Sequence, residues 1–368
     1  MPDWRFGFSG PVKHGSNLYA LITNQSGLGE WVGVAKSTDG GQTWAEQDSV
    51  NHKGLADQNR ASADCYVIGD TLRVYHTTTS GFLAVTDFDM AADTWGTTDV
   101  SSETISTMSV FGGYMGVCRS DGSDVILFQQ SSGCRYVVRN GVGDWDASNS
   151  LLLAEMTVGI ALGSDDRCHL LYMRSLSLYH QSLLADGDLG SASIVSSSSQ
   201  LFSDLYSHTG EVYPFGRPLV IEGNLYVPSI ISVRMGVPTL RVSIGADVDE
   251  PTWTHTTPDP NRAAAFGGVS FSWGSMVDVD GVPWLVYMAF DNGYVIPNGI
   301  WVTRYVDGAW EEGVEVLPPE IKRAYEGISV GSIGSHPAAI FMYDTKTYYA
   351  ELPMVSTPAS GGVIYYAY

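Results

Sequence analysis

The sequence predicts an all-β protein folded as a single β-propeller of seven four-stranded blades, with six blades as the alternative. Short segments of about 5 to 8 residues alternate apolar and polar residues with period 2. They come in groups of about four, and the groups repeat about every 50 residues along the chain of 368 residues. A four-stranded sheet of such short strands cannot bury both faces alone, so the pattern favours sheets packed in a ring over a sandwich.

The most complete turn, at residues 37–44, shows the plan of one unit. The Asp39 carboxylate and the hydroxyls of Ser37 and Thr43 are placed to satisfy the backbone N–H groups of the turn. Gly41 allows a positive φ, and Trp44 opens the returning strand as an apolar anchor. These five residues predict a hairpin corner with a structural role.

Units 1 to 4 follow this plan with decreasing regularity. Each has apolar strands, then a Gly or Asp turn, then a Trp that opens the next strand, except that Leu189 replaces the Trp of unit 4. Because units 3 and 4 are irregular and could be divided wrongly, six blades stay an alternative. The predicted segments are 18–22, 31–35 and 37–44 in unit 1; 66–68, 72–75, 82–85 and 89–95 in unit 2; 125–128, 136–138 and 143–145 in unit 3; and 170–172, 178–179 and 186–189 in unit 4.

Units 5 to 7 lead to a prediction about how the ring closes. Unit 7 has three strands but no following turn and Trp, whereas the turn-plus-Trp pattern is found at the N-terminus, at Asp3 and Trp4. We therefore expect the N-terminal strand to complete the last blade, with residues 1–352 forming the propeller and residues 353–368 an aromatic tail. The predicted segments are 218–221, 225–227, 240–242 and 252–253 in unit 5; 276–279, 284–287, 300–302 and 307–310 in unit 6; and 328–330, 339–342 and 347–350 in unit 7.

The pattern Ser-x-Asp-x-Gly-x-Thr-Trp at residues 37–44 resembles the Asp-box of sialidase-like β-propellers. In that family the motif forms the hairpin between the third and fourth strands of a blade and lies away from the active site. The resemblance implies a propeller architecture for the whole chain and a link to glycan handling. The family's Arg-Ile-Pro signature is absent near the start of the chain, and the segment that ends in Arg217 and Pro218 lacks the Ile. We therefore assign no catalytic residue.

Charge and cysteine content exclude several classes of partner. The chain carries 40 acidic against 19 basic residues, a formal net charge of −21, and lysine is scarce next to arginine. Nucleic acid and anionic membranes are thus not expected as partners, because both require a cationic surface. The acidic excess indicates either solubility or a halophilic adaptation. No phosphate loop, zinc spacing or EF-hand pattern is present, so no cofactor and no metal site are expected. Cys65, Cys118, Cys134 and Cys168 are expected to be buried free thiols.

Strand direction predicts where a ligand would bind. Because successive strands are antiparallel, the connections between blades share one face with the loops between second and third strands, opposite the 37–44 turn. Four of these connections carry an arginine just before an innermost strand, at the expected rim of the central channel. Guanidinium groups there would suit a carboxylate, sulfate or phosphate, although they could equally tie adjacent blades together. The candidate ligand-binding residues are Arg60, Arg217, Arg262, Arg323, Tyr206, Glu211, Tyr213 and Tyr325.

Three function classes remain open at this stage. The first is a non-catalytic recognition module for host attachment, binding a cell-surface glycan or receptor protein. The second is an exo-glycosidase on acidic sugars, for which Tyr206 or Tyr325 with Glu211 or Glu155 would be the candidate pair. The third is a purely structural ring among other subunits. No secretory signal and no membrane-spanning segment are visible, which favours a virion or other extracellular particle, with the cytoplasm as the alternative.

Overall fold

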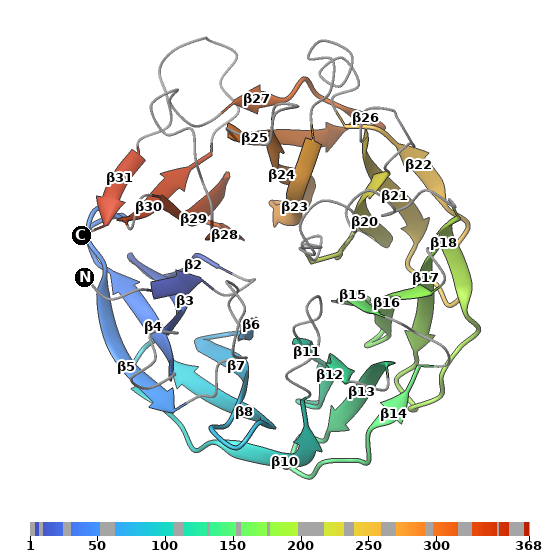
Figure 1. The fold of residues 1–368 in the computed structure, drawn as a ribbon, viewed down its shortest axis with the longest axis horizontal. Coiled ribbons are helices and arrows are strands. Elements are labelled where there is room, and N and C mark those ends of the chain that lie inside the picture. The colour runs from blue at the N-terminus through green and yellow to red at the C-terminus, as the bar shows by residue number, and fades with distance from the viewer. Residues whose placement is uncertain are drawn as a thin grey trace.

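The chain folds into a β-propeller of seven antiparallel sheets arranged in a ring, each with four strand positions (Figure 1). In blades 1, 2 and 6 one of these positions is divided between two short strands that pair with the same neighbour. The computed structural model describes residues 4–6, 10–24, 31–51, 63–105, 114–130, 133–151, 156–174, 177–197, 217–231, 239–258, 270–290, 297–315, 326–343, 346–352 and 364–367. Within these ranges there is no helix, so none is available to cross a membrane. The predicted all-β fold with seven blades is confirmed over six blades.

Each blade is made of strands that are consecutive in sequence, with the first strand nearest the centre of the ring (Figure 1). Blade 1 contains β1 (Trp4–Phe6), β2 (Val12–His14), β3 (Asn17–Asn24), β4 (Trp31–Ser37) and β5 (Ala45–Asn51). Blade 2 contains β6 (Asp64–Ile68), β7 (Thr71–Thr77), β8 (Phe82–Asp89), β9 (Thr94–Trp95) and β10 (Asp99–Thr104). Blade 3 contains β11 (Tyr114–Cys118), β12 (Asp124–Gln130), β13 (Gly133–Arg139) and β14 (Asn149–Ser150). Blade 4 contains β15 (Met156–Leu162), β16 (Cys168–Arg174), β17 (Ser177–Leu183) and β18 (Ser193–Ser197).

The remaining three blades repeat the same order. Blade 5 contains β19 (Leu219–Ile221), β20 (Asn224–Ile231), β21 (Thr239–Ala246) and β22 (Thr254–Thr256). Blade 6 contains β23 (Ser270–Val279), β24 (Val282–Phe290), β25 (Pro297–Val306), β26 (Ala309–Trp310) and β27 (Val314–Glu315). Blade 7 contains β28 (Glu326–Ser332), β29 (Pro337–Tyr343), β30 (Lys346–Glu351) and β31 (Ile364–Ala367).

The expected closure of the ring by the N-terminal strand is wrong. Trp4 pairs with Asn24 of β3, so β1 and β2 together form the inner strand of blade 1. The outer strand of blade 7 is β31, which pairs with β30 and comes from the 353–368 segment that was expected to form a tail. The physical reason is that β3 needs an antiparallel partner on its inner side, and β1 and β2 supply it along successive parts of the strand. The first and last blades are therefore both complete, and they stand next to each other in the ring (Figure 1).

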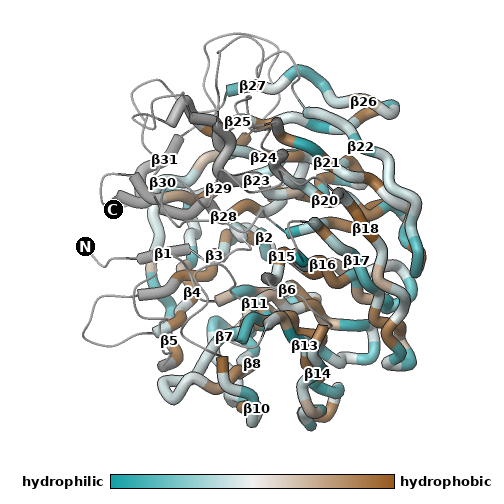
Figure 2. Tube along the Cα trace, turned by 45° about the vertical axis from the view of Figure 1, so that its right-hand side comes forward, coloured by the Kyte–Doolittle hydropathy of each residue, from teal (hydrophilic) through white to brown (hydrophobic). Residues whose placement is uncertain are grey.

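The core lies between the blades and explains the composition of their middle strands. In β12 the consecutive residues Val125 to Phe128 are all buried, because neighbouring blades cover both faces of the strand. Outer strands alternate instead, as in β10. Apolar residues accordingly follow the inner strands, and hydrophilic ones gather at turns and on outer strands (Figure 2). All four cysteines are buried free thiols, as the sequence predicts.

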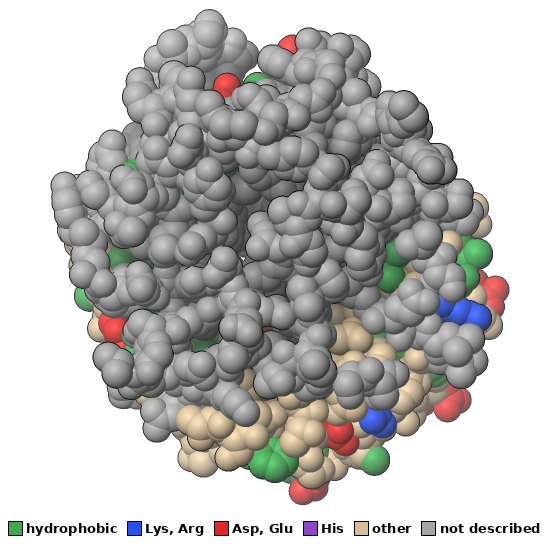
Figure 3. Space-filling model, in the orientation of Figure 1, with side chains coloured by type: hydrophobic (Ala, Val, Ile, Leu, Met, Phe, Trp, Pro, Cys, Tyr) green, Lys and Arg blue, Asp and Glu red, His purple; other side chains and the backbone are tan. Residues whose placement is uncertain are grey.

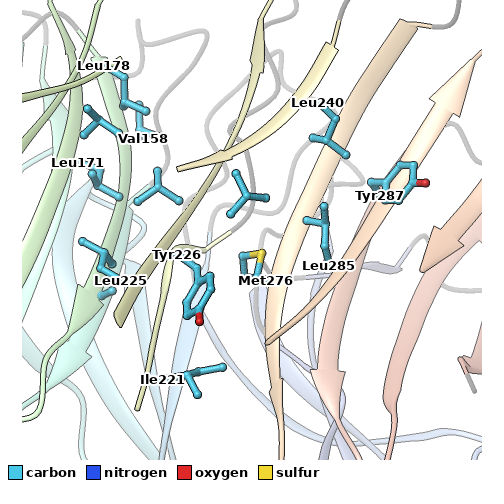
Figure 4. Packing of buried hydrophobic residues seen from close by; sticks show 14 of the residues in the cluster. Val158, Leu171, Leu178, Ile221, Leu225, Tyr226, Leu240, Met276, Leu285 and Tyr287 are labelled. Carbon is cyan, nitrogen blue, oxygen red and sulfur yellow. The ribbon is translucent and has the colours of Figure 1, made fainter. Parts of the chain in front are cut away.

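One cluster shows how three blades share a core. Side chains of blade 4 such as Leu171 meet Leu225 and Tyr226 of blade 5, which in turn contact Met276 and others of blade 6 (Figure 4). Full burial of an aliphatic or aromatic side chain of this size contributes about 1.5 to 3 kcal/mol. Each blade is thus stabilised mainly by its neighbours, as the repeat pattern predicts.

The two faces of the ring differ in what they carry. One face, called here the turn face, holds the described turns that follow the first strands and the third strands of the blades. Contacts at these turns join adjacent blades, as in the hydrogen bond between Ser120 and Asp166 and the 2.5 Å ion pair from Lys36, near the end of β4, to Asp93. The opposite face, called here the connection face, is where the innermost strands begin. Figure 3 views the ring from this side, and described side chains at its lower and right rim include several Asp or Glu.

Candidate functional site at the centre of the ring

Arg217 is the one predicted ligand-binding residue that lies within the described part of the chain. It directly precedes Pro218 and the short inner strand β19. Pro218 packs so closely on blade 4 that a Cβ atom at Gly159 would lie 2.5 Å from its Cδ. The other candidates lie outside the described residues: Arg60, Tyr206, Glu211, Tyr213, Arg262, Arg323 and Tyr325.

The guanidinium group of Arg217 links blade 5 to two blades that are not its neighbours in the ring. Its Nη1 donates to the carbonyl oxygen of Cys65 in blade 2 at 3.1 Å, and its Nη2 donates to the carbonyl oxygen of Gly116 in blade 3 at 2.6 Å. The same Nη2 forms an ion pair with the Asp64 carboxylate. The ring of Tyr66 lies 5.8 Å from the guanidinium carbon, within cation–π range.

Asp64 supplies the matching charge. Its side chain is fully buried, whereas that of Arg217 is 18% exposed. The same carboxylate oxygen accepts the Gly116 N–H at 3.1 Å, so it joins blades 2 and 3 as well as holding the arginine. A buried carboxylate is tolerated only when it is paired and hydrogen-bonded, and both conditions are met here. The pair therefore fixes three inner strands around one point.

Arg217 and Asp64 hold the inner strands of blades 2, 3 and 5 together through charge and hydrogen bonds. Burial raises the pKa of the Cys65 thiol, which stays protonated and is a poor nucleophile. Burial also raises the pKa of Tyr66, and the nearby Arg217 only partly opposes this effect. The contacts of Arg217 therefore match the alternative in which the arginine links blades to one another. A ligand-binding role for Arg217 stays a prediction.

The 37–44 turn lies on the turn face, between β4 and β5. The Asp39 carboxylate accepts hydrogen bonds from the Thr43 N–H at 2.9 Å and the Thr43 hydroxyl at 2.6 Å. These bonds to Thr43 lower the pKa of Asp39 to about 2. The Ser37 hydroxyl accepts the Gly41 N–H at 2.8 Å, and the Trp44 indole donates to the Gly41 carbonyl at 3.1 Å. The turn is internally bonded and stays away from Arg217.

Sequence reasoning missed a second buried ionic centre, between blades 2 and 3. The fully buried Asp124 carboxylate pairs with Arg73 at 3.2 Å and with Arg139 at 2.9 Å, and it accepts the Tyr75 hydroxyl at 3.0 Å. Arg73 also binds Asp87, and this hydrogen bond is the main cause of its raised pKa. The sequence did contain one signal for this centre. Asp124 is a charged residue that directly precedes the apolar run of β12.

In the described ranges no three His, Cys, Asp or Glu side chains are grouped so that they could hold a metal ion. The ionic centres described above are instead neutralised by arginine.

No family model and no curated protein matches the sequence. Among solved structures, a fungal lectin from Aleuria aurantia with a six-bladed β-propeller fold is 11% identical over 95% of this chain and 91% of its own, with a TM-score of 0.49. A triple arginine-to-alanine mutant of AofleA from Arthrobotrys oligospora is 13% identical over 86% and 87% of the two chains, with a TM-score of 0.48. The phage phi92 endosialidase is 10% identical over 98% of this chain and 64% of its own, with a TM-score of 0.45. At these values the similarities assign this chain no activity.

Proposed function

We propose that this protein is a non-catalytic recognition propeller that binds an acidic cell-surface glycan, or a receptor protein that carries one, through its connection face. The observation that supports this is the strand order. Because every blade begins with its innermost strand, β6, β19, β23 and β28 all start on the connection face. The chain segments that lead into these four strands contain Arg60, Arg217, Arg262 and Arg323.

The charge balance makes such a face selective. The chain has a net charge of −21, so four positively charged arginines before the inner strands stand out from its acidic composition. A guanidinium group binds a planar carboxylate or sulfate through two parallel hydrogen bonds, which fixes orientation as well as charge. In this proposal Arg217, already held by Asp64, keeps the inner strands in place, and the other three arginines meet the ligand.

The test is binding of immobilised acidic glycans and of intact cells by the unmodified protein and by the double variant Arg262→Ala/Arg323→Ala. We expect the double variant to bind at least about tenfold more weakly, since each lost charge-assisted contact contributes about 1.5 to 3 kcal/mol. Arg304→Ala is the matched control, because Arg304 is 39% exposed and its contacts among the described residues, an ion pair with Glu311 and a cation–π contact with Trp284, stay within blade 6. If circular dichroism shows that the double variant is unfolded, these arginines hold adjacent blades together and do not form the ligand site.

The enzymatic alternative is decided by a separate assay. A glycosidase would need two carboxyl groups, or a tyrosine and a carboxyl group, at a set separation around the bound sugar. We expect fluorogenic acidic-sugar substrates to remain uncleaved over hours at a protein concentration that saturates glycan binding. Cleavage that is lost in Glu211→Gln would replace the recognition function by the exo-glycosidase function.

The setting in a virion or other extracellular particle, together with other structural subunits, is part of the same proposal. It carries over the expectation drawn from the sequence, and its test is independent of ligand binding. We expect the chain to copurify with intact particles and to be accessible to antibody on their surface. If purified particles lack the chain, its placement in a particle is wrong, and so is the alternative of a purely structural ring. The proposal of glycan binding would not be affected.

A further inference from the structure

Four polar side chains form a continuous hydrogen-bonded chain at the junction of blades 4 and 5. His169 lies on β16, His180 on β17 and Ser193 at the start of β18, whereas Asp247 follows β21 of blade 5. The Ser193 Oγ lies 3.4 Å from His180 Nδ1, His180 Nε2 lies 2.8 Å from His169 Nδ1, and His169 Nε2 lies 2.7 Å from Asp247 Oδ1. Both histidines are fully buried, and the Asp247 side chain is 2% exposed.

The chemistry of the groups fixes the direction of every bond. An ionised carboxylate can only accept, so His169 carries its proton on Nε2 and presents a bare Nδ1. His180 must then donate from Nε2, which leaves its own Nδ1 to accept the Ser193 hydroxyl. At neutral pH each histidine is therefore held neutral in one tautomer, with both ring nitrogens bonded.

Two charged side chains, Arg167 and Asp165, lie beside the Asp247 end of this chain. Asp247 is anchored at its second oxygen by the Ser164 N–H at 2.7 Å and the Ser164 hydroxyl at 2.9 Å. Arg167 donates to the Asp247 carbonyl oxygen at 2.9 Å and also binds the Asp165 carboxylate at 2.8 Å. The edge of Trp253 covers His180, with ring centroids 5.6 Å apart.

These surroundings disfavour added protons. Burial lowers the pKa of His169, against the opposing effect of Asp247. Burial, then His169 and Arg167, lower the pKa of His180 to about 3. Burial opposes ionisation of Asp247, but the bonds from Ser164 and His169 still lower its pKa.

One added proton can be accommodated, but two cannot. With one proton, His169 donates from both nitrogens, to Asp247 and to His180, and His180 shifts its own proton to Nδ1 and donates to Ser193. Every bond is kept, and the positive charge faces Asp247. A second proton places two N–H groups of adjacent cations against each other across 2.8 Å, and this bond must break.

We propose that this chain is an acid-operated latch that holds the turn of Asp247 against blade 4 and releases it when both histidines are protonated. The packing of Leu171 and Leu225 stays in place below it, so the release is local to the turn face. The junction between blades 6 and 7 is packed instead by apolar side chains such as Val286 and Phe341, and its described residues include no histidine pair.

The experiment is hydrogen exchange of the intact protein at a series of pH values from 7 to about 3, corrected for the intrinsic pH dependence of exchange. We expect peptides covering 163–170, 178–184 and 243–250 to lose protection, at least about tenfold and with a two-proton dependence, before peptides 284–290 and 337–343 of the junction between blades 6 and 7. Simultaneous loss of protection at both junctions would overturn the proposal.

The double variant His169→Gln/His180→Gln keeps donors and acceptors but cannot be protonated, so we expect its junction to stay protected down to the pH of global unfolding. His76→Gln is the control, because His76 is buried in blade 2 and bonds to Thr86. Opening of the junction in the double variant at the unmodified pH would refute the latch.

Should the double variant fail to fold, histidine ring nitrogen spectra of the unmodified protein decide the matter. Two neutral Nε2–H rings at pH 7, a first proton shared by both rings, and a second proton coincident with faster exchange would support the latch. Independent titration of the two rings without faster exchange would refute it.

Discussion

Gly41 of the first blade lies directly against the ring of Tyr349 in the last blade. A Cβ atom at position 41 would overlap the Tyr349 ring, and the Trp44 ring packs on the same tyrosine with centroids 5.8 Å apart. Tyr349 is fully buried by these contacts. Since no strand crosses from blade 1 to blade 7 in the described residues, the ring closes through such side-chain packing, together with the bond from the Ser329 hydroxyl to the Gly10 carbonyl.

Replacement of Gly41 should therefore weaken the closure of the ring. We expect Gly41→Ala to lower the free energy of unfolding by about 3 kcal/mol, from overpacking and from the positive φ of this residue. Gly40→Ala is the matched control, because Gly40 also has a positive φ of 72° but no atom within 4 Å of an added Cβ. It should cost about 1 kcal/mol. Equal urea midpoints for the two variants would mean that the Tyr349 contact is unimportant.

The Arg217 and Asp64 pair should be strongly coupled. We expect Arg217→Ala and Asp64→Ala each to cost about 3 to 5 kcal/mol, because each leaves a buried charge without its partner. The double variant should cost much less than the sum of the two. Arg304→Ala, at a half-exposed pair, should change stability by less than about 0.5 kcal/mol. Chemical denaturation of all four variants measures the coupling, and additive losses would contradict it.

Acid should destabilise the protein partly through His76. Burial lowers the pKa of His76 to about 4, below its value of about 6.5 in the unfolded chain. Between these values the unfolded state binds more protons, so stability falls as pH falls through this window, by about 1.4 kcal/mol per pH unit at most. We expect His76→Gln to remove this slope between pH 6 and about 4.5. Parallel curves of unfolding free energy against pH for the two proteins would rule it out.

Salt should distinguish the two explanations of the acidic composition. With a net charge of −21, carboxylate repulsion opposes folding at low ionic strength, and ions screen it. If the surface is a halophilic adaptation, the melting temperature should rise between about 0.1 M and about 2 M NaCl. A flat or falling melting temperature would leave solubility as the explanation.

Much of the fold was predictable because its information is local. Short-range spacing of residues determines the period of the strands, and the residues of the 37–44 turn determine the hairpin and its Trp anchor. The repeat of such units then indicates the blades. The number of blades followed from counting the repeated units. The antiparallel order of the strands predicted which loops lie on the same face of the ring. The sequence could also place Arg217 just before an inner strand, although not its partners.

The sequence by itself determined that this chain is a ring of repeated antiparallel sheets, because hydrophobic period and turn chemistry act over a few residues. Only the tertiary structure decided that β1 joins blade 1 and β31 completes blade 7, since either terminus could supply a strand of that composition. It alone brought Arg217 to Asp64, 153 positions apart, and His169 to Asp247, 78 positions apart. Such pairings depend on how seven separately predictable sheets pack around one axis, and that packing is cooperative over the whole ring.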